Sequence, residues 1–252
     1  MSEASFSDPG TLVLIALAFL LAGTVKGVVG FGLPTIALAL LTATLGLPQA
    51  MALFLAPSVV ANLWQASAGG HAREIWPRIW PFLLAAFVAV WIGALALARV
   101  EEAYLSALLG VILIIYALVS LTRFQPRLAP AQARWAGPLV GIVNGVITGM
   151  TGTFVVPGVI YLRALDLSRD QLIHAMGMLF ATSTIALGLA LGGYGRLTGD
   201  LALLSLLAVL PAMAGMSLGQ RIRRSLSEAL FGRLFFLALM ALGAYIIVRA
   251  LS

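Results

Sequence analysis

The chain has 252 residues, of which 62% are hydrophobic and only 10% are charged, with a formal net charge of +6 and no cysteine. An average soluble domain carries roughly 25% charged residues, so this composition excludes a soluble enzyme and a soluble nucleic-acid-binding domain. The missing cysteine also excludes iron–sulfur, cysteine–zinc and thiol-redox sites. Several apolar runs approach the ~20 residues that a spanning helix needs, and the alternation of a membrane barrel is absent. The sequence therefore predicts an all-α polytopic membrane protein.

Ten apolar segments follow one another along the chain. They cover residues 11–29, 33–46, 49–69, 78–98, 102–122, 138–150, 153–164, 170–192, 200–220 and 229–250. The third to fifth and the eighth to tenth segments are predicted to be full spans. The first two segments are short and meet at a glycine-rich break. The sixth and seventh segments are also short and meet at a second glycine-rich break. Each short pair predicts a broken or re-entrant helix, and the sequence leaves open which of the two forms.

The distribution of arginines among the loops predicts a topology. Most arginines fall in four alternate loops: Arg73, Arg78, Arg123, Arg127, Arg134, Arg163, Arg169, Arg221, Arg223 and Arg224. Because positively charged loops stay in the cytoplasm, we expect these loops inside the cell and the N-terminus outside. The sixth and seventh segments must then cross the membrane an even number of times together. The first ten residues contain no lysine or arginine, which argues against a cleaved signal peptide.

An internal repeat divides the chain into two halves. Residues 23–29 match residues 141–147, and a second set of identities follows in the same order. The second set pairs Ala50, Met51, Ala56 and Ser58 with Ala175, Met176, Ala181 and Ser183. We interpret residues 1–125 and 126–252 as two transmembrane repeats of one transport domain. Each repeat holds five segments, an odd number, so the repeats are predicted to have opposite orientations, as in many secondary transporters.

The two glycine-rich breaks are predicted to form an anion site between the repeats, near the membrane midplane. The residues concerned are Gly30, Phe31 and Gly32 in the first break, and Gly149, Thr151, Gly152 and Thr153 in the second. A helix that restarts after a break directs free backbone N–H groups and the positive end of its dipole at the break. Thr151 or Thr153 is the expected N-cap of the seventh segment. For the small residues, close helix packing is the alternative interpretation.

Polar side chains within the apolar segments are further candidates for this site. Lys26 is the only charged residue clearly inside an apolar run, and we expect it to bind the charge of an anion, with snorkelling to the membrane surface as the alternative. Its counterpart in the second repeat is Asn144. Asn62 and Ser183 are expected to add neutral hydrogen bonds, unless they join helices to one another. His174 is a candidate for proton coupling, with a structural role as the alternative.

The remaining polar residues give no sign of catalysis. Every aspartate and glutamate falls in a loop or at a segment end, which argues against coupling through a carboxylate inside the membrane. The sequence shows no cluster of metal ligands and no motif for nucleotide hydrolysis or acyl transfer. We therefore predict no enzyme activity, no metal and no cofactor. The predicted partners are a small anion and the lipid bilayer but not nucleic acid, and a homodimer stays open.

The residues at the breaks resemble those of the TauE/SafE family of sulfite and organosulfonate transporters. The resemblance rests on GTVKGVVGFG at 23–32 with Pro34, and on GIVNG at 141–145 followed by GMTG at 149–152. It covers the whole chain, and it implies transport of a small sulfur-containing anion across a bacterial inner membrane. We predict an exporter. The alternatives are a channel-like permease for other oxyanions or carboxylates and, more remotely, an intramembrane enzyme.

Overall fold

The computed structural model describes residues 8–67, 70–122, 126–223 and 228–252. Within these ranges the chain is all-helical and contains no strand, which confirms the predicted fold class. The helices are α1 (Pro9–Val29), α2 (Leu33–Leu45), α3 (Leu47–Leu53), α4 (Leu55–Ser67), α5 (Ala72–Ala94), α6 (Ala96–Arg99), α7 (Glu102–Leu121), α8 (Pro130–Thr151), α9 (Gly158–Arg163), α10 (Arg169–Gly193), α11 (Gly199–Leu207), α12 (Val209–Ile222) and α13 (Glu228–Leu251).

Six stretches of helix in the described part of the chain are long and apolar enough to cross a membrane. They are Pro9–Val29, Ala72–Arg99, Glu102–Leu121, Arg169–Gly193, Gly199–Ile222 and Leu230–Leu251. Helices α3 and α4 form a seventh such stretch if they count as one span with a bend of 46°. Helix α2 is apolar but short, as its place directly after a break predicts.

The sixth and seventh predicted segments were wrong in extent. Helix α8 begins at Pro130 rather than at residue 138, because Gln132 accepts a hydrogen bond from the Ala129 N–H at 3.0 Å and Pro138 is accommodated inside the helix. Helix α9 is only six residues long, and residues 153–155 before it are not helical. Neither Thr151 nor Thr153 caps it, since α9 starts after Pro157. The second break is therefore longer and less helical than its sequence indicated.

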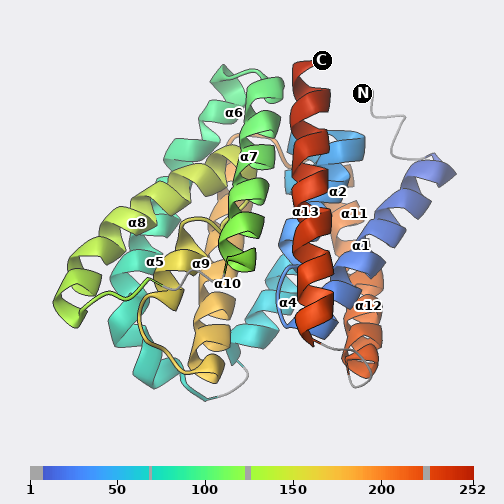
Figure 1. The fold of residues 1–252 in the computed structure, drawn as a ribbon. Helices are drawn as coiled ribbons and strands as arrows, with labels where there is room; N and C mark the ends of the chain where they lie inside the picture. The colour runs from blue at the N-terminus through green and yellow to red at the C-terminus, as the bar shows by residue number, and fades with distance from the viewer. Residues whose placement is uncertain (1–7, 68–69, 123–125, 224–227) are drawn as a thin grey trace.

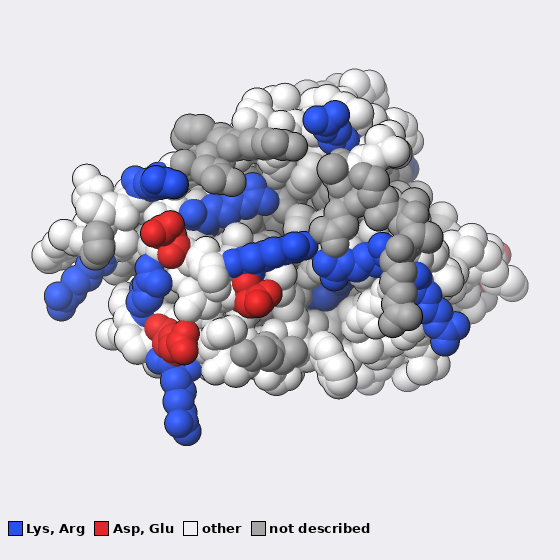
Figure 2. All heavy atoms as spheres, turned by 60° about the horizontal axis from the view of Figure 1, so that its bottom comes forward, with Lys and Arg blue, Asp and Glu red and all other residues white. Residues whose placement is uncertain are grey.

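The bundle has one end rich in basic side chains. The start of α1 and the end of α13 lie at the same end of the bundle (Figure 1), and Figure 2 shows lysine and arginine side chains spread over the opposite face. Glu74 accepts a hydrogen bond from Gln171 at this basic face, so the starts of α5 and α10 meet there. Arg127 before α8 and Arg163 at the end of α9 line one cavity, so the second broken pair starts and finishes at the same end of the bundle, as the loop charges predicted. Arg123 and Arg224 of that prediction lie outside the described residues.

Helix pairing follows a twofold pattern that is consistent with two repeats. The most extensive contacts join α5 to α8 and α1 to α12, and the next join α7 to α13 and α4 to α10. In the two predicted repeats, α1 corresponds to α8, α5 to α12, α4 to α10 and α7 to α13. Exchanging corresponding helices turns the α5–α8 pair into the α12–α1 pair. The same exchange leaves the α7–α13 and α4–α10 pairs unchanged. In both exchanged pairs, a Cβ atom at a repeated glycine would collide with a backbone carbonyl of the partner helix. The collisions are Gly23 with Ala212, Gly27 with Met216, Gly141 with Phe82, and Gly145 with Ala86.

These collisions decide between the two interpretations of the small residues in α1 and α8. Helices can approach this closely only where no side chain intervenes. Gly149 belongs to the same face, because a Cβ atom there would collide with Val90 and Ala94 of α5. Packing therefore explains why position 149 holds a glycine, and its expected role in binding the substrate stays a prediction.

Candidate anion-binding site

Lys26 lies in the last turn of α1 and points into the protein. Only 4% of its surface is exposed, and its Nζ donates a 2.6 Å hydrogen bond to Oδ1 of Asn62 on α4. This geometry excludes the snorkelling alternative. The aspartate and glutamate side chains that the structure describes are all exposed, and none of them forms an ion pair with Lys26. The ammonium is thus held by a neutral amide, an expensive arrangement within the membrane.

Two buried asparagines have amide groups whose orientation is fixed by their partners. Asn62 receives a hydrogen bond from the Lys26 ammonium, and Asn144 on α8 receives one from the Gly158 N–H at 2.9 Å. Both partners can only donate, so the acceptor in each amide must be Oδ1. Each Nδ2 group is then a donor, and neither has a partner in the part of the chain that the structure describes. A buried donor without a partner costs about 1–3 kcal/mol, which a bound acceptor would recover.

The first break is built by two glycines with positive φ angles. Gly30 (φ 88°) ends α1, and Gly32 (φ 100°) precedes the first turn of α2, conformations that residues with a Cβ atom rarely adopt. Phe31 between them is half-buried and packs against the core. Among the described residues no side chain caps the N-terminus of α2.

Several backbone groups of the second break have hydrogen-bond partners in the break itself or in α8. The Thr153 N–H donates to Thr151 Oγ1 at 3.3 Å, and the Thr153 carbonyl accepts from Thr148 Oγ1 at 3.1 Å. Asn144 occupies the Gly158 N–H at the start of α9. The two breaks were expected to present free N–H groups alike, and in this respect the second differs from the first. The Thr153 hydroxyl is buried and has no partner within the described ranges.

The second break also packs against the first repeat. Gly152 (φ 74°) ends α8, and a Cβ atom there would crowd Met51 and Phe54. The Phe154 ring lies 6.5 Å from the Phe54 ring and 4.8 Å from the Phe180 ring, measured between centroids. The contact between Phe54 and Phe154 therefore joins the two predicted repeats beside the break.

Helices α4 and α10 place two serines at neighbouring levels. Gly177 packs against the α4 backbone at Gln65, and a Cβ atom at Gly188 would lie 3.7 Å from Leu55, so the helices run antiparallel. The internal repeat pairs Ser58 with Ser183. In this register the two serines lie within about half a helical turn of each other along the helix axes. Both serines are fully buried, and neither Oγ hydrogen-bonds to another described residue.

A cavity of about 470 Å³ leads to Lys26 and Gly30 from the basic face. Exposed Asp170 and Arg223 line it towards the surface, and buried His174 lines it further in. Sequence reasoning did not assign Asp170 or Arg223 to the site, because both fall at segment ends where charge is expected from topology alone. Asn62, Asn144 and Ser183 do not line this cavity.

Comparison with known proteins identifies the family. The model of the sulfite exporter TauE/SafE family matches residues 15–246, nearly the whole chain, including Lys26 and both breaks. The chain belongs to the TauE/SafE family. It is therefore a membrane transporter of the sulfite or sulfonate type, as the residues at the breaks had indicated. No curated protein and no solved structure matches the chain.

Proposed function

We propose that this TauE/SafE protein exports a small sulfur-containing oxyanion, such as sulfite or a short organosulfonate, across the bacterial inner membrane. The observation that carries the proposal is the buried ammonium of Lys26, whose hydrogen-bond partner is the neutral amide of Asn62. Since no described carboxylate pairs with it, the positive charge is left for a ligand. An anion that enters the cavity would compensate this charge.

The comparison of the two repeats supports a site that is strongest in the first repeat. In the second repeat Asn144 occupies the N–H at the start of α9. The matching position in the first repeat holds Lys26, which cannot accept a hydrogen bond and so cannot cap α2. An oxyanion could accept hydrogen bonds both from Lys26 and from the backbone at the start of α2. We assign the charge of the anion to Lys26 and its remaining oxygens to Asn62 Nδ2 and the backbone at Gly30–Gly32.

The other buried donors fit a route between the repeats. Three buried groups lack partners among the residues that the structure describes: Asn144 Nδ2, the Thr153 hydroxyl and Ser183 Oγ. All three can donate to an oxyanion, and none carries a charge that would trap it. We assign them to successive hydrogen-bonding positions beyond Lys26.

The driving force in this proposal is the membrane potential. The described carboxylates are all exposed, so none is placed inside the bundle to carry a coupling proton or sodium ion. An anion that leaves a cell with a negative interior gains about 2.3 kcal/mol per elementary charge for each 100 mV. This gain corresponds to roughly fiftyfold outward accumulation of a monovalent anion.

A binding screen on the purified protein tests the assignment. We expect sulfite, thiosulfate, sulfoacetate and taurine to bind more tightly than their carboxylate analogues. Sulfite or a short sulfonate should bind most tightly. Lys26→Gln should weaken this binding while expression and folding persist, and Lys26→Arg should weaken it as well because a guanidinium is larger and planar. Wild-type affinity in Lys26→Gln would remove Lys26 from the site. Counterflow in proteoliposomes should be present for a carrier and absent for a channel-like permease.

A further inference from the structure

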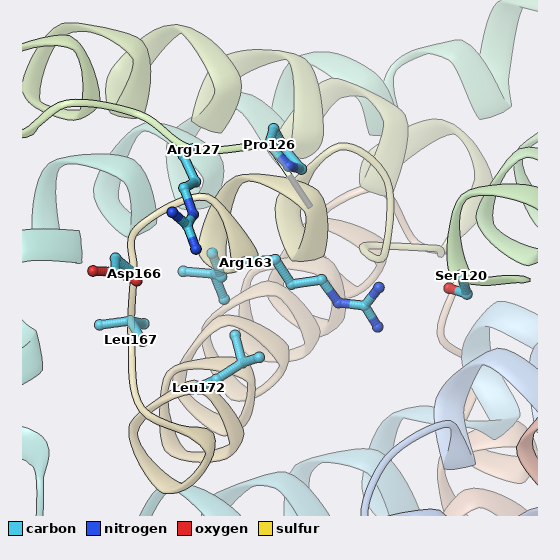
Figure 3. A pocket seen from close by; sticks show the side chains of 8 residues that line it. Ser120, Pro126, Arg127, Arg163, Asp166, Leu167 and Leu172 are labelled. Atoms are coloured by element: carbon cyan, nitrogen blue, oxygen red, sulfur yellow. The ribbon is translucent and has the colours of Figure 1, made fainter. Parts of the chain in front are cut away.

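A second cavity, of about 560 Å³, opens at the basic face between the ends of several helices. Its lining includes Ser120 near the end of α7, Arg127 before α8, Arg163 at the end of α9 and Asp166 after it. It shares no lining residue with the cavity that leads to Lys26. Figure 3 shows that Arg163 extends from α9 towards Ser120, while Arg127 lies on the side of Asp166.

The charges of this second cavity favour an anion. Two guanidinium groups line it against one carboxylate, that of Asp166, and Asp166 is exposed to solvent. Among the described residues neither Arg127 nor Arg163 forms an ion pair. Arginine presents a planar set of donors that matches phosphate oxygens in pairs.

Two buried hydroxyl groups on α7 continue the donor set inward. Ser120 and Tyr116 lie one helical turn apart on α7, and neither hydroxyl has a partner among the described residues. Tyr116 is only 1% exposed. A buried hydroxyl without a partner is costly, so the pair is explained if a ligand or its hydration water reaches them.

We propose that this cavity binds a phosphate-bearing anion, whose phosphate lies between Arg127 and Arg163 and is within reach of Ser120. The volume falls within the ~300–1,000 Å³ of small-molecule sites and exceeds what a bare oxyanion fills. Two kinds of molecule carry such a phosphate at the cytoplasmic end of a membrane protein: an anionic phospholipid, in its headgroup, and a soluble phosphate ester. Basic pockets at this level commonly bind lipid headgroups. The inference does not rest on the proposed transport function.

The test compares binding of three probes to the delipidated full-length chain in detergent. The probes are short-chain phosphatidylglycerol, soluble glycerol phosphate, and short-chain phosphatidylcholine as the zwitterionic control. We expect phosphatidylglycerol to bind more tightly than phosphatidylcholine. Binding of glycerol phosphate as well would identify the phosphate ester as sufficient, and its failure alone would identify the source as the lipid.

Matched variants locate the site. Arg127→Gln and Arg163→Gln should each weaken binding of phosphatidylglycerol about tenfold, the loss of one charge-assisted contact. Arg221→Gln changes an exposed arginine that lines neither cavity, and it should bind as wild type. Lys26→Gln should also bind as wild type, which separates this site from the transport site. Equal binding of phosphatidylglycerol and phosphatidylcholine would overturn the proposal, and so would wild-type binding in both cavity variants.

Discussion

Replacing the neutral partner of Lys26 with an acid is the sharpest perturbation of the proposed site. Asn62→Asp would put a carboxylate oxygen where Asn62 Oδ1 now accepts a 2.6 Å hydrogen bond from Nζ. The shape of the side chain stays the same, but the ammonium acquires a counter-ion within the protein. At a separation of about 4 Å and an effective dielectric constant of about 20, two unit charges interact by about 4 kcal/mol. The carboxylate would repel an incoming anion by a similar amount.

We therefore expect Asn62→Asp to weaken anion binding about a thousandfold, since ~1.4 kcal/mol is a factor of ten. Isothermal titration with sulfite measures the affinity, and thermal unfolding shows that the variant is folded. Asn62→Leu is the uncharged control: it removes the partner of Lys26 without adding a negative charge, and should weaken binding far less. In a Lys26→Gln background the added carboxylate has no charge to neutralise, so the two effects should not add. Wild-type affinity in Asn62→Asp would refute the reasoning that the charge of Lys26 is reserved for the substrate.

Three further outcomes follow from the fold and the site. Single cysteines at positions 72 and 129 should react only from the cytoplasm and one at 197 only from outside, and labelling of the first two from opposite faces would contradict the inverted repeats. Gly145→Leu should unfold at a markedly lower temperature because it collides with the Ala86 carbonyl, whereas Gly192→Leu, which meets open space, should match wild type. His174→Ala should keep potential-driven flux within about twofold of wild type; flux that follows only a pH gradient and disappears in His174→Ala would establish proton coupling instead.

The sequence was sufficient for the helical membrane architecture because hydrophobic run length reports directly on membrane insertion. It failed where a helix continues beyond its apolar part. The first two turns of α8 include Gln132 and Arg134, polar residues that lie outside any apolar run and yet extend the helix. Before α9 the residues are apolar but not helical, since hydrophobicity alone does not decide between a helix and a buried extended segment.

In the candidate site, the sequence predicted the residues but not the contacts between them. Lys26 and Asn62 were both predicted as polar members of the site, since each interrupts an apolar segment. Their hydrogen bond, across 36 positions of sequence, depends on how α1 and α4 pack, and one sequence carries no signal for that. The same holds for Asn144, whose capping of α9 could not be predicted while the start of α9 was placed at the wrong residue.

The central claim is that an anion crosses the membrane on this protein by virtue of the buried charge at Lys26. Flux of sulfite in proteoliposomes under an imposed membrane potential tests it most directly. We predict saturable flux towards the positive side in the wild type, with Lys26→Gln reduced at least tenfold at equal protein content. No flux in the wild type, or equal potential-driven flux in wild type and Lys26→Gln, would contradict the claim.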